Sequence, residues 1–144
     1  MEYEQFVENV QREAGLRSTE AERIVRAVFV TLAERLGKGE RDLLADQLPK
    51  KLKIYLGNEA SPPTFAIEEF YNRIQSRADI GHPEAIRQAR CVISVLSRAI
   101  GENQLQRIFS GLQGDLDELL RGPKSSLSPT TDSSELAGEA GLAE

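Results

Sequence analysis

The chain has almost none of the residues that usually carry catalysis or metal binding. It contains one cysteine, one histidine and no tryptophan. Cys91 cannot close a disulfide within one chain, and His82 alone cannot build a multi-histidine metal site. We expect His82 to cap a helix start or face solvent, and Cys91 to pack as a small hydrophobe. Without glycine-rich phosphate loops, Cys-x-x-Cys, His-Glu-x-x-His or Gly-x-Ser-x-Gly motifs, we expect no catalytic residue, no metal and no cofactor, hence no enzyme.

Long apolar runs are also missing. No stretch approaches the roughly 18 apolar residues that a membrane-spanning helix needs. The first residues, 1–5, lack the basic region followed by an apolar stretch that marks a secretory signal. A single cysteine suits a reducing compartment. We therefore expect a cytoplasmic protein that does not interact with membranes.

The chain also lacks an excess of basic residues. The 18 Lys and Arg residues are outnumbered by 23 Asp and Glu residues, which gives a net charge of -5. A molecule of this charge does not attract phosphate backbones as a whole, so we expect no nucleic-acid partner. Its 40% hydrophobic and 28% charged residues are typical of a globular protein, and 144 residues fit one domain.

An internal repeat is the strongest positive feature. Residues 4–56 align without a gap on residues 68–120, with identity at 14 of 53 positions. Most of the other aligned positions keep their apolar or polar character. The identical pairs include Phe6 and Phe70, Ala21 and Ala85, Arg23 and Arg87, Arg26 and Arg90, Val28 and Val92, Leu32 and Leu96, Gly37 and Gly101, and Leu52 and Leu116. We infer two tandem copies of one unit.

Apolar residues in each copy recur at spacings of three and four, which predicts amphipathic helices and an all-α fold. Each copy is a unit of three to four helices. The expected helices lie near 3–14, 18–36 and 40–48, with a fourth around Leu52 and Leu56, and then near 66–78, 82–100 and 102–112, with a fourth around Leu116 and Leu120.

Residues at the expected helix ends suggest specific caps. Ser18 or Thr19 is expected to cap the second helix, and Thr19 with Glu22 has the spacing of a capping box. Gly37 and Gly101 follow the long helix of each copy, where a left-handed residue commonly ends a helix.

The domain organisation follows from these patterns. Residues 1–121 form the duplicated domain, with repeat 1 at about 3–57, a linker at 57–64 and repeat 2 at about 65–121. Residues 122–144 are predicted to be a disordered acidic tail. A unit of about 55 residues is marginally stable alone, so we expect a shared core and one cooperative unfolding transition.

Several segments together resemble the bacterial family called domain of unknown function 2267. They are Ala-x-x-x-x-Arg-Ala-Val at 21–28, Leu-Ala-Glu-Arg-Leu at 32–36 and Gln-Leu-Pro at 47–49. The resemblance covers about residues 3–121 and implies a helical, duplicated domain with no established activity. The second copy departs from it, because Gly-Leu-Gln replaces Gln-Leu-Pro at 111–113.

Four arginines repeat between the copies: Arg23, Arg26, Arg87 and Arg90. One interpretation is local ion pairing on the helix surface, worth about 0.2 to 0.5 kcal/mol per pair. The alternative is a symmetric face that binds an anion or a partner, since Arg suits bidentate contacts. The expected local pairs are Glu20–Arg23, Glu22–Arg26 and Glu84–Arg87.

The last helix of each copy carries opposite charge. Lys50, Lys51 and Lys53 form a basic cluster, whereas the positions aligned with Lys51 and Lys53 are Asp115 and Asp117. These faces either attract each other, between two molecules or within one chain, or are solvated independently.

These features favour a non-catalytic protein–protein interaction or adaptor module. Its expected partner is an unidentified protein or a second copy of the chain. One alternative is a helix-turn-helix-like nucleic-acid binder that uses the patch at 50–53. The other is an enzyme of unrecognised type.

Overall fold

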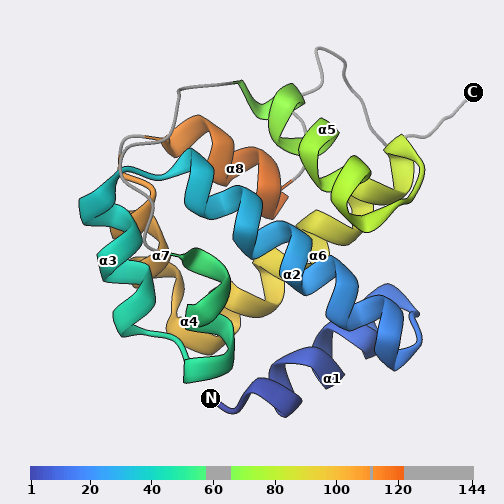
Figure 1. Cartoon of the computed structure of the whole chain (residues 1–144). Helices are drawn as coiled ribbons and strands as arrows, with labels where there is room; N and C mark the ends of the chain where they lie inside the picture. Colours follow the sequence, from blue (N-terminus) through green and yellow to red (C-terminus); the bar gives the residue numbers. More distant parts are fainter. Residues whose placement is uncertain (58–65, 111, 122–144) are drawn as a thin grey trace, which may run out of the picture.

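A computed structural model describes residues 1–57, 66–110 and 112–121 (Figure 1). These residues form eight α-helices and no strand, which confirms the predicted all-α class. Most of the predicted linker and the predicted tail lie outside the described residues. The helices are α1 (Tyr3–Ala14), α2 (Ser18–Arg35), α3 (Lys38–Asp46), α4 (Lys50–Leu56), α5 (Ile67–Ala78), α6 (His82–Ile100), α7 (Glu102–Ile108) and α8 (Gln113–Arg121).

The helix order recurs along the chain. The starts of α5, α6 and α7 each lie 64 residues after those of α1, α2 and α3, and α1 and α5 both contain 12 residues. The helices thus lie where the aligned sequence segments place them. The common origin of the two copies stays a prediction from the sequence.

The long helices α2 and α6 supply the centre of the core (Figure 1). In each, apolar residues spaced three or four apart form one buried stripe, as their spacing predicts. The stripe residues are fully buried in both helices, and burial of each large aliphatic side chain contributes about 1.5 to 3 kcal/mol. They are Ala21, Val25, Val28 and Leu32 in α2, and Ala85, Ala89, Val92 and Leu96 in α6.

The first helix of each copy packs against the long helices of both copies. Helix α1 contacts α2 and α6, and α5 contacts α6 and α2. Phe6 in α1 and Phe70 in α5 are each 1% exposed, and the rings of Phe6 and Phe29 are 5.7 Å apart. One hydrophobic cluster therefore includes residues of both copies.

The predicted left-handed caps at Gly37 and Gly101 are wrong. Gly37 has φ -71° and precedes α3 as its N-cap, while α2 ends at Arg35 and its C-cap, Leu36, is extended. Leu36 is 1% exposed, so the chain continues into the core there instead of reversing at a glycine. Gly101 has a positive φ of 93°, but its ψ of 141° lies outside the left-handed helical region.

Left-handed caps occur instead at the ends of α1 and α5. Gly15 has φ 68° and Asp79 has φ 57°. Each cap is followed by a residue whose backbone N–H donates back into the helix, from Leu16 to the Gln11 carbonyl at 3.0 Å and from Ile80 to the Gln75 carbonyl at 3.2 Å. Asp tolerates this conformation better than most non-glycine residues.

The predicted capping box at Thr19 and Glu22 is also displaced. Helix α2 begins at Ser18, and the backbone N–H of Arg17 donates to Glu20 Oε1 at 2.8 Å. The reciprocal carboxylate contact thus lies two residues earlier than expected.

Alanine substitution at two glycines should change stability in opposite directions. Gly15→Ala should lower the free energy of unfolding by about 1 kcal/mol, because the residue is left-handed. Gly39→Ala should raise it by about 0.5 kcal/mol, because Gly39 lies within α3. A methyl group meets no atom within 4 Å at either position, so packing does not confound urea unfolding curves. Two shifts of the same sign would contradict this assignment.

Candidate functional site

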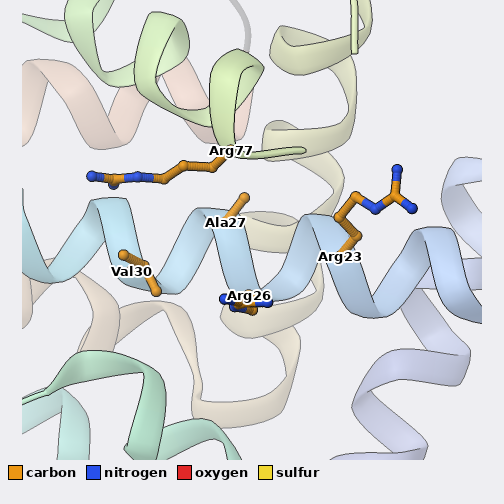
Figure 2. A pocket seen from close by; sticks show the side chains of 5 residues that line it. All are labelled: Arg23, Arg26, Ala27, Val30 and Arg77. Atoms are coloured by element: carbon orange, nitrogen blue, oxygen red, sulfur yellow. The ribbon is translucent and has the colours of Figure 1, made fainter. Parts of the chain in front are cut away.

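The residues predicted to interact are divided between different pockets, since Arg23 and Arg26 line one pocket and Lys50 and Lys53 line another. Arg23 and Arg26, from α2, line a pocket of about 230 Å³ together with Arg77 from α5 (Figure 2). Ala27 and Val30 complete the lining. Three guanidinium groups thus come from two helices that are distant in sequence.

Arg23 and Arg26 keep their charges unpaired within the described part of the chain. Both side chains are exposed, and neither forms a hydrogen bond or an ion pair with a described residue. The predicted pairs with Glu20 and Glu22 are therefore not formed. Glu20 instead bonds the backbone at the start of α2.

Arg77 is held by two groups on α2. Its guanidinium donates to both carboxylate oxygens of Glu34, at 2.8 and 2.7 Å, and to Thr31 Oγ1 at 2.7 Å. Figure 2 shows its side chain running along α2, away from Arg23. Arg77, and additionally Arg73, lower the pKa of Glu34. This network joins α5 to α2 and neutralises part of the charge beside the pocket.

The equivalent arginines of the second copy have different surroundings. Arg87 forms the predicted pair with Glu84 at 2.7 Å, and it also donates to the Ala14 carbonyl at 3.1 Å. Arg90 is half-buried, and its Nε has no hydrogen-bond partner among the described residues. The four arginines therefore do not present the same arrangement twice.

The oppositely charged faces do not meet within one chain. Lys51 Nζ pairs with Glu4 at 3.0 Å, whereas Asp115 accepts a 2.5 Å bond from Arg35 in a largely buried ion pair. Asp117 pairs with the last residue of α8 at 3.2 Å. The intrachain form of the hypothesis is wrong, because each side finds a partner elsewhere. The intermolecular form stays a prediction, although these aspartates are already engaged.

Lys50 and Lys53 line a separate groove of about 490 Å³ on α3 and α4. Ile54 also lines it and is 67% exposed, more than any other large hydrophobic residue that the structure describes. The complete lining is Arg41, Asp42, Ala45, Lys50, Lys53, Ile54, Leu56 and Gly57. This groove combines exposed apolar surface with clustered positive charge.

Arg41 is the residue that sequence analysis missed. It is only 5% exposed, although it is charged. The repeat alignment contained a signal, because Arg41 occupies the position of Leu105, an apolar core residue of the second copy.

Other candidate chemistry is sparse. The described residues contain no group of three or more His, Cys, Asp or Glu side chains arranged to hold a metal ion. No helix in that part of the chain is long and apolar enough to cross a membrane. His82 is exposed at the start of α6, with Nδ1 3.0 Å from Gln75 Oε1, and Cys91 is half-buried.

The Glu34 network generates a pH-dependent prediction. Glu34→Gln should lower the free energy of unfolding at pH 7 by about 1 to 2 kcal/mol, because charge-assisted bonds to Arg77 and Arg73 are weakened. Since folding lowers the Glu34 pKa, this contribution is complete above the ordinary value of 4.5 and is lost as pH falls through the folded-state pKa. Urea unfolding at pH 7 and pH 3 should show the difference between the proteins shrinking in acid.

Glu69→Gln is the matched control for this network. Glu69 also pairs with Arg73, but its side chain is 45% exposed, so we expect a loss below about 0.5 kcal/mol. Equal losses for the two variants, or a Glu34 effect that does not change with pH, would contradict the assignment.

The comparisons with known proteins bear on the family. A family model described as "Uncharacterized conserved protein (DUF2267)" matches residues 3–119. A comparison with curated proteins finds no match. The matched residues contain α1 to α7 and most of α8, including both the arginine pocket and the α3–α4 groove. The chain therefore belongs to the DUF2267 family.

Proposed function

We propose that the protein is a non-catalytic binding module that holds an acidic, partly apolar segment of another protein in the α3–α4 groove. The observation that carries this proposal is the exposure of Ile54 in a groove lined by Lys50 and Lys53. An apolar anchor beside cationic groups is complementary to a segment that presents a hydrophobic side chain between carboxylates.

The orientation of α4 explains why Ile54 is available. Leu52 and Leu56 direct the same short helix into the core, where they are 0% and 3% exposed. Ile54 lies between them in sequence and consequently faces outward, since alternate residues cannot share one helix face. Burying the Ile54 side chain under a bound segment would contribute up to about 2 kcal/mol to the binding free energy. The lysines would favour acidic partners and accelerate their association.

The charges around the groove favour another protein over a second copy of this chain. The acidic residues of α8 that would complement the lysines are bonded within their own chain, Asp115 to Arg35 and Glu118 to the Tyr71 hydroxyl. The net charge of -5, and Asp42 in the groove lining, also disfavour nucleic acid.

Selection from a displayed library of random 12-residue peptides tests this proposal. The wild type should enrich peptides that combine Asp or Glu with Leu, Ile or Phe. The double variant Lys50→Glu/Lys53→Glu should no longer enrich them, because it reverses the charge of the groove. Ile54→Ser should lower the affinity for the selected peptides about tenfold, because the apolar contact is lost.

The control variant is Arg107→Glu, which changes an exposed basic residue on α7 outside the groove. It should select the same peptides as the wild type. Enrichment of peptides without acidic residues would refute the proposal. So would a lysine double variant that selects the wild-type set.

A further inference from the structure

Arg41 is a charged side chain at a core position. It lies in α3 and is 5% exposed, yet it lines the groove. Its guanidinium forms no hydrogen bond or ion pair with any residue that the structure describes. Because an arginine side chain carries a permanent positive charge, this largely buried residue is a cation without a counter-ion among the described residues.

In the second copy, the positions aligned with this part of the groove are filled by core residues. The positions aligned with Arg41 and Ala45 are Leu105 and Phe109, which are 0% and 1% exposed. There, two large apolar side chains fill the core. In the first copy, the short side chain of Ala45 and the charge of Arg41 instead line a groove. The groove thus lies where the large apolar residues of the second copy are replaced by Arg41 and Ala45.

Among the described residues, the lining of the groove leaves Arg41 without a free carboxylate partner. Lys50 and Lys53 add two positive charges to the lining, and Asp42 is its only carboxylate among the described residues. Asp42 pairs with Lys38 at 3.0 Å. A cation on a largely buried side chain without a described partner is less well solvated than one at the surface, and an anion that entered the groove would offset that cost.

We propose that Arg41 is a carboxylate-binding site in the groove, which receives an Asp or Glu side chain of the bound segment. A carboxylate matches the planar fork of the guanidinium and forms two parallel hydrogen bonds with it, while Lys50 and Lys53 add attraction at longer range. The natural occupant rests on the proposed function, but the site itself can be tested with a small carboxylate. Arg41 would then supply the requirement for acidic residues, and Ile54 the apolar contact.

The test measures melting temperature in sodium glutarate against sodium chloride of equal ionic strength. Glutarate carries the carboxylate of a glutamate side chain without a peptide. At 100 mM glutarate the wild type should melt a few degrees higher than in chloride, because a ligand that binds only the folded state stabilises it. Arg41→Leu should show no such difference, and in chloride it should melt above the wild type, as expected when an unpaired buried charge becomes a leucine.

Two further variants keep the result interpretable. Arg107→Leu removes an exposed arginine outside both the groove and the arginine pocket, and should respond to glutarate as the wild type does. Arg41→Lys keeps the charge but loses the bidentate geometry, so its melting temperature should rise in glutarate by no more than half as much as that of the wild type. This variant tests the inference independently if Arg41→Leu does not fold. Inorganic phosphate should stabilise less than glutarate, and a larger Arg41-dependent effect of phosphate would overturn the carboxylate assignment.

The outcomes separate this inference from the proposed function. A glutarate response that requires Arg41, with no peptide selected from the library, would retain the carboxylate site and reject the peptide-binding module. Acidic peptides that bind Arg41→Leu as tightly as the wild type would retain the module and overturn the role of Arg41. A wild type that does not respond to glutarate, together with a less stable Arg41→Leu, would make Arg41 a structural residue and overturn the inference.

Discussion

The packing of each copy's first helix against the other copy's long helix is the constraint on which the structure depends. Helix α5 lies on α2, and α1 lies on α6. Both contacts carry an ion pair at positions 64 residues apart, with the charges exchanged: Glu34 with Arg77, and Arg98 with Glu13. The two helix contacts thus carry equivalent ion pairs in which the acidic and basic residues are exchanged. Neither copy can complete its core without the other, because a helix of the opposite copy covers part of its apolar surface.

This shared core leaves the shorter helices free to differ. Around α3 and α4 the chain presents Arg41, Lys53 and Ile54, whereas the aligned positions of α7 and α8 carry Leu105, Asp117 and Glu118. The second copy fills its space with leucine and phenylalanine, and its acidic residues bond within the chain. The first copy retains a groove lined by Arg41, Lys50 and Lys53, which have no ion-pair partner among the described residues. The proposed binding site therefore lies in one copy, while both copies contribute residues to the core.

Apolar spacing was sufficient to predict the helices and the buried stripes, because that pattern depends only on local helical geometry. Val28 and Leu32 are buried as predicted. The left-handed caps were misplaced, because a glycine such as Gly37 permits a positive φ without requiring it. The Arg77–Glu34 network joins residues 43 positions apart, which no local spacing reveals. Arg41 was overlooked because its local spacing does not reveal its burial, although the aligned Leu105 marks a core position.

We infer that Arg41 is tolerated at a core position because a groove lies beside it. The most direct test is to place arginine at the aligned position of the second copy and measure the free energy of unfolding of Leu105→Arg. Leu105 is fully buried among apolar residues, so we expect a loss of more than about 3 kcal/mol, or failure to fold. A loss below about 1 kcal/mol would show that either copy accommodates a buried arginine, and would contradict the claim.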